Sequence, residues 1–346
     1  MVIVKELQIP GYEKVVEIID APTGLHGFIS IHSTKPGPSL GGLRMLPYAS
    51  REEALTDVLK LSKAMSYKSA LAGTGLGGGK SVLIGSPKKD KTKELLLAYG
   101  EALNELKGDY IAAEDVGTTT ADMMVIHQKS PHVAALPQKK SSGDPSRFTA
   151  FGILKGIEAC AEFLFGSPSL KGKRVAIQGL GNVGCKLAHF LFWQGAELIY
   201  ADLDEEHLEK CNLQLGGKVV STKEILTVPC DFFAPCALGG VLNPETIPHL
   251  KCKAVAGSAN NQLSDEEMGK KLYQRGILYA PDYVVNAGGI INASQEFAPG
   301  GYNPNTARER TENIYQVLLE IFKESKIKHA PTNTIANRLA ESKLEK

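Results

Sequence analysis

Short apolar runs alternate along the chain with stretches in which apolar residues recur at helical spacing. This alternation is typical of an α/β fold, in which helices between the strands cover a sheet. The clearest helix follows residues 50–53, whose serine and glutamate have the spacing of a capping box. Leu55, Val58 and Met65 then share one helical face, and the helix leads to Lys68. We therefore expect Lys68 to lie at the end of a rigid element.

A strand, a glycine-rich turn and a helix follow one another in the second half of the chain. Residues 173–178 form a short apolar run that ends at glycines in G-x-G-x-x-G spacing, and residues 186–192 continue as a helix. In such a unit the first glycine makes a tight turn, the second lets the backbone approach a pyrophosphate, and the third lets the helix pack on the strand. The pattern predicts a Rossmann-type site with the cofactor-binding residues Gly179, Gly181, Asn182, Val183 and Gly184.

The next predicted strand, residues 197–201, ends in Asp202. A carboxylate at this position accepts hydrogen bonds from an adenosine ribose and repels the 2′-phosphate of NADP. Residues 203–206 add further acidic side chains and contain no arginine that could receive a phosphate. The cofactor predicted from the sequence is therefore NAD.

Residues 136–147 are polar and rich in turn-forming residues, which indicates a domain boundary. We expect a hinge there, with one domain over residues 1–134 and the Rossmann domain over residues 135–325. Residues 326–346 are expected to form a C-terminal helix that returns to the first domain.

Composition restricts the partners and the compartment. A chain of 346 residues with 43% hydrophobic and 22% charged residues is typical of a globular protein of two domains. Its net charge of +1 offers no excess of positive charge for a nucleic-acid partner. No apolar run reaches the ~18 residues of a membrane span and no signal-peptide pattern starts the chain, so a cytoplasmic location is expected. The six cysteines include no C-x-x-C pair, which predicts buried free thiols rather than disulfides or a metal site.

Two lysines flank a glycine-rich run at residues 73–79. Lys80 precedes an apolar run and has little side-chain bulk beside it, so partial desolvation would let it act as a base near neutral pH. Lys68 would remain charged and hold an anion. Asp115 follows another apolar run at the start of a polar turn, where a carboxylate can relay protons to a neighbouring lysine. This constellation suggests an enzyme that handles an amino acid.

Residues 77–81 also imitate the end of a phosphate-binding Walker A loop. The pattern G-x-x-x-x-G-K-[ST] requires a glycine where this chain has Thr74. A strand-like run also takes the place of the helix expected after Ser81. A nucleoside triphosphatase is therefore disfavoured.

Seven segments together resemble the Glu/Leu/Phe/Val amino acid dehydrogenases, and within that family they are most similar to the leucine dehydrogenase branch. They are residues 37–45, 65–81, 113–118, 176–184, 230–240, 256–263 and 280–289. The resemblance runs from about residue 9 to about residue 339. It implies an NAD-dependent enzyme that reversibly deaminates a branched-chain L-amino acid to its 2-oxo acid and ammonia. The first domain would bind the substrate and perform catalysis.

The resemblance also implies roles for individual residues. Lys80 matches the base that activates water, and Asp115 matches the acid that exchanges protons with the amine. Lys68, with the backbone of Gly41 and Gly42, matches the site of the substrate carboxylate. The other matching positions are Met65 and Asn261 for the substrate, Thr149 for the nicotinamide carboxamide and Asn286 for the cofactor.

The positions that match the side-chain pocket are Leu40, Ala113, Ile290 and Ala293, and all four are apolar. A glutamate side chain would be buried there without a partner for its charge, which disfavours glutamate. Leucine-type relatives tend to carry valine at the last two positions, so the pocket departs from theirs. Leucine, isoleucine, valine and phenylalanine stay open as substrates, and the alternative is a phenylalanine- or valine-preferring dehydrogenase.

Asn260 and Ala134 depart from the aspartate and threonine that leucine-type relatives often carry. These departures leave open a catalytically silent NAD-binding homologue. The presence of Lys68, Lys80 and Asp115 argues against that alternative.

Relatives in this family are homo-oligomers, so we expect at least a homodimer. The apolar residues Val2, Ile3 and Val4 of an N-terminal strand could pair edge to edge across a twofold axis. The alternative is that this strand closes the edge of its own sheet.

Overall fold

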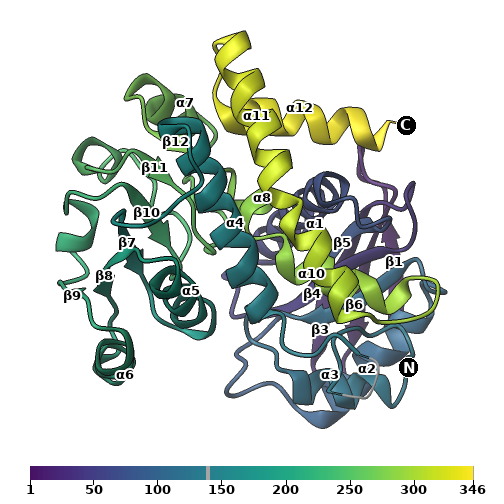
Figure 1. The fold of residues 1–346 in the computed structure, drawn as a ribbon. Helices are drawn as coiled ribbons and strands as arrows, with labels where there is room; N and C mark the ends of the chain where they lie inside the picture. The colour runs from purple at the N-terminus through teal and green to yellow at the C-terminus, as the bar shows by residue number, and fades with distance from the viewer. Residues whose placement is uncertain (138–140, 346) are drawn as a thin grey trace. The chain divides into compact units, whose positions relative to one another are not determined.

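The computed structural model describes residues 1–137 and 141–345, and the chain divides into two compact units (Figure 1). The first unit comprises Met1–Asp144, Ala293–Pro304 and Ala340–Lys346, and the second comprises Pro145–Asn292 and Asn305–Leu339. The first unit thus extends beyond the expected end at residue 134 and gains a segment from the second half of the chain. Within the expected hinge, residues 138–140 lie outside the described residues.

The first unit is built on a mixed six-stranded sheet in the order β1-β2-β3-β5-β4-β6. The strands from β1 to β5 in this order pair antiparallel, whereas β4 pairs parallel with both β5 and β6. Because parallel strands point the same way, the carboxyl ends of β4, β5 and β6 share one edge. The strand bounds are β1 Ile3–Leu7, β2 Lys14–Asp20, β3 Leu25–Ser33, β4 Ser39–Leu46, β5 Gly77–Ile84 and β6 Tyr110–Glu114.

Helices cover both faces of this sheet. On one face, Phe28 and Val82 pack with residues of α1 (Arg51–Ala72). The next residues along β3 and β5, Ile29 and Leu83, point to the other face and pack with α2 (Lys93–Asn104) and α3 (Thr120–His127). The alternation of side chains in each strand therefore supplies two apolar layers, one for α1 and one for the α2 and α3 pair.

The predicted start of α1 is confirmed, and its end lies beyond Lys68. Ser50 Oγ accepts a hydrogen bond from the Glu53 N–H at 3.0 Å. The Glu53 carboxylate accepts from the N–H of Ala49 and not from that of Ser50, so only half of the capping box forms. The helix continues to Ala72 and ends at Gly73 in the left-handed conformation.

The glycine run between the lysines allows α1 to pack closely on β5. A Cβ on Gly78 would lie 2.0 Å from the backbone nitrogen of Ser66 on α1. Any side chain at position 78 would therefore push the helix off the sheet. Because β5 begins at Gly77, Lys80 lies inside the strand and not ahead of it, and the residues after Ser81 continue the strand. This strand excludes a Walker A loop, which leads into a helix.

The second unit contains a parallel six-stranded sheet in the order β12-β11-β10-β7-β8-β9. When β7 to β12 are numbered 1 to 6 along the chain, the sheet read from its β9 edge has the order 3-2-1-4-5-6. This is the strand order of the Rossmann fold, which confirms the prediction. The winding reverses between β7 and β10, and open α/β sheets bind ligands beside such a reversal. The strand bounds are β7 Arg174–Gln178, β8 Glu197–Ala201, β9 Lys218–Val219, β10 Phe232–Pro235, β11 Ala254–Val255 and β12 Leu278–Tyr279.

The second unit also carries α-helices and short 3-10 segments. Its helices are α4 (Ser146–Phe165), α5 (Asn182–Trp193), α6 (Glu205–Leu215), α7 (Glu267–Gln274), α8 (Asp282–Val285) and α11 (Ile314–Lys328). Within the part of the chain that the structure describes, three helices have residues in both units: α9 (Gly288–Ser294), α10 (Pro304–Glu312) and α12 (Thr332–Leu344). The 3-10 segments are η1 (Glu224–Leu226), η2 (Ile247–His249) and, in the first unit, η3 (Gln295–Phe297).

The end of α12 belongs to the first unit, where the Tyr67 hydroxyl donates to the Glu341 carboxylate at 2.5 Å. Thr332, at the start of the same helix, donates from its hydroxyl to the carbonyl of Tyr279 at 2.6 Å in the second unit. The expected C-terminal helix therefore forms over Thr332–Leu344, and Ala340–Lys346 belong to the first unit.

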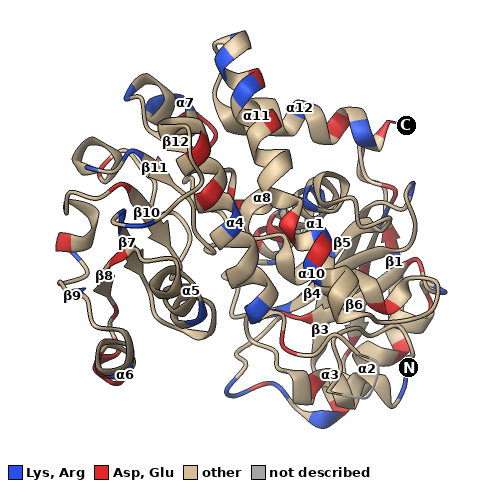
Figure 2. Ribbon diagram, in the orientation of Figure 1, with Lys and Arg blue, Asp and Glu red and all other residues tan. Residues whose placement is uncertain are grey.

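The strand β1 lies at the edge of its sheet and pairs on one side with β2. Val2 and Val4 pack against the core of the first unit, and Ile3 is exposed. Acidic and basic residues are interspersed along the elements of both units (Figure 2). Within the described residues, no helix combines the length and apolarity needed to cross a bilayer.

All six cysteines are free thiols, and the predicted burial holds for four of them. Four of them are buried and two are partly exposed: Cys160, Cys211, Cys230 and Cys252, then Cys185 and Cys236.

Candidate active site

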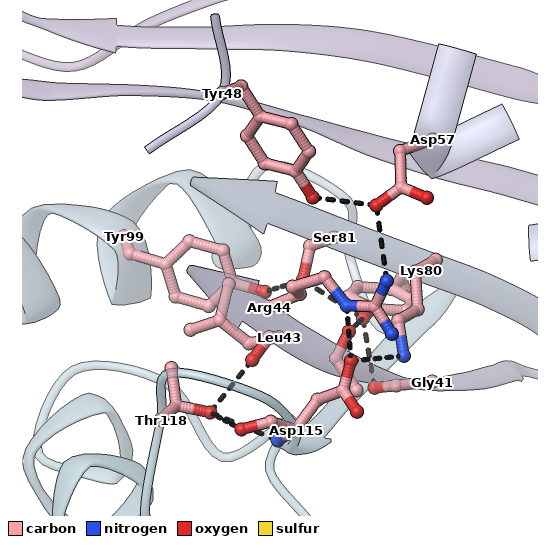
Figure 3. Close-up of polar contacts among 12 residues, drawn as sticks. Gly41, Leu43, Arg44, Tyr48, Asp57, Lys80, Ser81, Tyr99, Asp115 and Thr118 are labelled. Atoms are coloured by element: carbon pink, nitrogen blue, oxygen red, sulfur yellow. Dashed lines mark hydrogen bonds and ion pairs between the residues drawn. The ribbon is translucent and has the colours of Figure 1, made fainter. Parts of the chain in front are cut away.

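Three charged side chains from neighbouring strands meet on one face of the first sheet (Figure 3). Lys80 lies on β5, Arg44 lies on β4, and Asp115 directly follows β6. The parallel register pairs Arg44 with Val82, two positions beyond Lys80, and side chains two positions apart point to the same face. The sheet therefore brings together the two predicted catalytic residues and Arg44, for which no role was predicted.

Asp115 receives both cations on one oxygen atom. Its Oδ2 accepts from Lys80 Nζ at 2.7 Å and from Arg44 Nε at 3.0 Å. The side chains are largely withdrawn from water, with exposed fractions of 7% for Lys80, 13% for Arg44 and 17% for Asp115. Sheltered ionic hydrogen bonds of this kind are stronger than ion pairs on the surface.

These contacts determine the charge of Asp115. Burial alone would raise the pKa of this carboxyl, but the nearby charges of Lys80 and Arg44 outweigh burial and hold the pKa well below its usual range. Asp115 is therefore a carboxylate at neutral pH and accepts protons. It donates a proton only after it has taken one up from another group.

The turn that follows β6 is tied to β4, which fixes the position of Asp115. Thr118 Oγ1 donates to the carbonyl of Leu43 at 2.7 Å and accepts from the N–H of Asp115 at 3.0 Å. A Cβ on Gly42 would lie 2.6 Å from the Cβ of Asp115 and 3.1 Å from Lys80 Nζ. Glycine at position 42 therefore leaves open the space beside the ion pair.

The predicted carboxylate-binding residues lie on the same face of the sheet as Lys80. Met65 and Lys68 are on α1, which packs through Ser66 against Gly78 of β5. Lys68 is half-buried. The Tyr110 hydroxyl donates to the carbonyl of Gly41 at 2.9 Å and holds that stretch of backbone in place.

The four predicted pocket residues come from two places in the chain. Leu40, on β4, is buried, and Ala113 is half-buried on the adjacent strand β6. Ile290 and Ala293 are both buried, and their spacing places them on one face of α9.

The predicted dinucleotide site lies at the winding reversal of the second sheet. Gly179 makes the turn after β7 with φ of +96°. A Cβ on Gly184 would lie 1.9 Å from the carbonyl oxygen of Gly179, so only glycine lets α5 begin this close to the strand. A Cβ on Gly181 would meet no atom within 4 Å. The N–H groups of Asn182, Val183 and Gly184 precede the first helical hydrogen bond and suit a pyrophosphate.

Asp202 follows β8 and braces the glycine turn. Its Oδ2 accepts from the N–H of Leu180, and its Oδ1 accepts from the N–H of Asp204 at 2.9 Å. Each carboxylate oxygen has two lone pairs, so these bonds still leave acceptor capacity for a ribose hydroxyl.

Asn286 carries a buried amide that is only half used. Its Nδ2 donates to the Ser258 carbonyl at 3.1 Å and to Asn260 Oδ1 at 2.9 Å. Its Oδ1 is buried and has no hydrogen-bond partner among the described residues. An unused buried acceptor fits the carboxamide N–H group of a nicotinamide. Asn260 also keeps the acceptor oxygen that an aspartate would offer at that position.

Thr149 lies in the first turn of α4, where its hydroxyl donates to the carbonyl of Pro145 at 3.1 Å. A Cβ on Gly289 would lie 2.9 Å from Thr149 Oγ1, so the beginning of α9 packs directly against this side chain. Asn261 is exposed and has a left-handed backbone with φ of +52°. Non-glycine residues in this conformation are uncommon and cluster at functional sites. Ala134 is buried, and its N–H donates to the Ala112 carbonyl at 2.8 Å beside β6.

Sequence reasoning missed the groups that hold Asp115 in place. Arg44 extends its guanidinium to Asp57 Oδ2 on α1 at 3.2 Å, and the Tyr48 hydroxyl donates to the same oxygen at 2.7 Å (Figure 3). A single arginine between the apolar residues Leu43 and Met45 was the available signal, since such a charge requires a partner when it is buried.

Comparisons with known proteins agree with this geometry. Residues 14–132 match the protein family described as "Glu/Leu/Phe/Val dehydrogenase, dimerisation domain". Residues 199–341 match the family described as "Glutamate/Leucine/Phenylalanine/Valine dehydrogenase". A leucine dehydrogenase from Thermoactinomyces intermedius is 48% identical over 96% of this chain and 91% of its own length. The chain belongs to the Glu/Leu/Phe/Val dehydrogenase family.

Other members of the family are also similar. A phenylalanine dehydrogenase from Caldalkalibacillus thermarum is 45% identical over 98% of this chain and 93% of its own length. The crystal structure of L-tryptophan dehydrogenase from Nostoc punctiforme superposes with a TM-score of 0.85 at 40% identity, covering 97% of this chain and 96% of that one. The segments that resembled this family in the sequence therefore identified it correctly.

The low pKa of Asp115 makes a prediction about stability. A carboxyl whose pKa is depressed by folding stabilises the protein above its unfolded pKa of ~3.9, and this stabilisation is lost as the pH falls below that value. Asp115→Asn should therefore lower the free energy of unfolding at pH 7 by roughly 2–3 kcal/mol, somewhat less than the 3–5 kcal/mol typical of a fully buried pair. The loss should shrink as the pH falls below about 4.

Urea denaturation at several pH values measures this difference. Asp109→Asn, which breaks an exposed pair with Lys14, is the matched control and should cost less than about 1 kcal/mol. An Asp115→Asn protein that is as stable as the wild type at pH 7 would contradict the assignment.

Proposed function

We propose that this protein catalyses the NAD-dependent, reversible oxidative deamination of a branched-chain L-amino acid to its 2-oxo acid and ammonia. The observation that carries the proposal is the buried contact of Lys80 with Asp115, a base and a carboxylate on one sheet face. Membership of an amino acid dehydrogenase family and the Rossmann unit support it.

The residues divide the work of the reaction. Lys68 and the backbone at Gly41 and Gly42 hold the substrate carboxylate. Asp115 accepts a proton from the substrate ammonium, which frees the nitrogen lone pair. When bound, NAD supplies the acceptor for the hydride that leaves the substrate Cα. Lys80, as the neutral amine, then takes a proton from the water that attacks the iminium carbon.

Release of ammonia completes the proton accounting. The attack of water gives a carbinolamine that carries the former water oxygen and the amino group on one carbon. Asp115 returns its proton to the nitrogen and then takes the proton of the hydroxyl as the C–N bond breaks and the carbonyl forms. The released ammonia takes the proton of Lys80 and leaves as ammonium, and Asp115 passes its proton to solvent, so both residues return to their starting states. The shared hydrogen bond between Asp115 and Lys80 gives the two protons a short path between carboxylate and amine.

The second unit would hold the dinucleotide at the glycine turn and at Asp202. The open space at Gly181, the N–H groups at the start of α5 and the unused Oδ1 of Asn286 support this assignment. Asp202 favours NAD over NADP, because a 2′-phosphate would lie beside its carboxylate.

The apolar character of Leu40, Ala113, Ile290 and Ala293 supports an aliphatic substrate and disfavours glutamate. Similar proteins are named as dehydrogenases of leucine, phenylalanine and L-tryptophan. The second candidate is therefore a phenylalanine- or valine-preferring dehydrogenase. Formation of NADH from each amino acid in turn, measured at alkaline pH, distinguishes these substrates. No NADH from any of them would favour the catalytically silent homologue.

The separate roles of the two lysines predict different kinetic losses. Lys80→Ala should lower kcat by ~10²-fold or more, the usual effect of losing a general base, with NADH affinity nearly unchanged. Lys68→Ala should chiefly raise the KM of the amino acid. Steady-state kinetics and NADH fluorescence titration measure both effects. A kcat within threefold of wild type for Lys80→Ala, or a selective loss of NAD affinity for Lys68→Ala, would refute the respective role.

Asp202 predicts the cofactor preference. Asp202→Ser removes the charge that repels a 2′-phosphate, so the ratio of kcat/KM for NAD over NADP should fall by at least about tenfold. Glu205→Ser is the matched control, since Glu205 lies in the same acidic stretch at the start of α6. An unchanged ratio in Asp202→Ser would mean that another residue senses the ribose.

We also propose that the protein is a homo-oligomer, at least a dimer, with the free edge of β1 in its interface. A family description that names a dimerisation domain over residues 14–132 and the exposed Ile3 on an edge strand support this. Light scattering should show a dimer or larger species for the full chain and a smaller species after deletion of residues 1–6. A monomeric full chain would refute the dimer, and a truncated protein that keeps its size would refute β1 as the interface.

A further inference from the structure

Asp115 is held by two cations of different kinds, although the proposed reaction uses only one of them. Lys80 gains and loses a proton in that reaction, so its charge varies. Arg44 keeps its charge at every working pH, because a guanidinium does not lose its proton in proteins. Both contact Oδ2, at 2.7 Å and 3.0 Å, so neither contact occupies Oδ1 of Asp115.

Arg44 is anchored at its other end. Its Nη1 donates to Asp57 Oδ2 at 3.2 Å, and the Tyr48 hydroxyl donates to that same oxygen at 2.7 Å. The guanidinium therefore bridges a carboxylate on α1 and the carboxylate of Asp115 (Figure 3). A planar group held at both ends has little rotational freedom, and it fixes the carboxylate to which it donates.

A buried carboxylate needs a cation whenever it is ionised, and Asp115 must be ionised to accept the proton of the substrate ammonium. When Lys80 is the neutral amine, Asp115 loses the charge that lies nearest to it. With 17% of its side chain exposed, Asp115 would then be a poorly solvated anion without a counter-charge. The cost of this state would oppose the release of the proton from Lys80. The Arg44 guanidinium at 3.0 Å removes this penalty.

We propose that Arg44 is the positioning residue of this site, a fixed counter-charge that keeps Asp115 an oriented carboxylate while Lys80 is in its amine form. The proposal rests on the proposed function, because only that reaction requires Lys80 to lose its proton. The coupling of Arg44 with Asp115 is a property of the folded chain and does not depend on the reaction. Among the described residues, the other charged and titratable groups around this pair are Glu52, Glu53, Asp57 and Lys60 on α1, Tyr48 after β4 and the buried Tyr110 on β6. Lys60 lines the same pocket as Arg44, but the cations that contact Asp115 among the described residues are Lys80 and Arg44.

Kinetics of Arg44 variants separate charge from geometry. In Arg44→Met, deprotonation of Lys80 leaves a buried carboxylate without any cation, so the acid limb of the kcat profile should move to higher pH by about one unit or more. Its kcat at the optimum should fall by about tenfold or more through loss of orientation. Arg44→Lys keeps the charge but cannot bridge both carboxylates. Its acid limb should therefore stay near the pH of the wild-type limb, while its kcat should be lower than that of the wild type. Asp57→Asn should likewise lower kcat without moving the acid limb to higher pH.

Arg51→Met is the matched control, because Arg51 makes a two-bond pair with Glu17 elsewhere in the same unit, at 2.7 Å for each bond. Arg51→Met should change neither the pH of the acid limb nor kcat at the optimum. An acid limb that is the same in Arg44→Met as in the wild type, with kcat within threefold, would overturn the proposal.

A double-mutant cycle of unfolding tests the same coupling without enzyme turnover. Arg44→Met and Asp115→Asn should be non-additive, with the double variant less destabilised than the sum of the two single changes, because each single change strands the partner's charge. Additive losses would overturn the proposal even in an inactive protein. A wild type that shows this coupling but forms no NADH would refute the proposed function and leave the role of Arg44 intact.

Discussion

Two positive and two negative side chains gather in a part of the first unit that water reaches poorly, and the need to pair them governs the site. Removing a charge from water costs several kcal/mol, which is recovered only when each ion meets an opposite charge at good geometry. Lys80, Asp115, Arg44 and Asp57 meet this condition as an alternating chain of contacts between 2.7 and 3.2 Å. Because they come from β5, the turn after β6, β4 and α1, the chain of charges fixes the relative positions of these elements.

Glycine makes this arrangement possible. Asp57 belongs to α1, and α1 packs on β5 at a distance that leaves no room for a Cβ at Gly78. On the adjacent strand, a Cβ at Gly42 would fill the space beside Lys80 and Asp115. The glycine-rich segments near the two lysines thus serve packing and access together. In the second unit Gly184 has a similar role, since it lets α5 start against the turn at Gly179.

The sequence predicted the features whose signals are local. The strand, glycine turn and helix around Gly179 follow from consecutive residues, and the family motifs marked Lys80 and Asp115 without knowledge of the sheet. The role of Arg44 depends on the parallel register of β4, β5 and β6, which no short segment contains. The membership of Ala293–Pro304 in the first unit likewise depends on contacts between distant parts of the chain. For example, the N–H of Ser142 donates to the Glu296 carboxylate at 2.6 Å. The bonds that tie Asp202 to the glycine turn had no sequence signal either.

In the resting protein, Asp115 is an ionised carboxylate held by Lys80 and Arg44. Neutron diffraction from crystals exchanged into heavy water at neutral pH would locate the exchangeable hydrogens of this cluster directly. We expect deuterium on Arg44 Nε directed at Asp115 Oδ2 and none bonded to either oxygen of Asp115. A deuterium bonded to an Asp115 oxygen would contradict it.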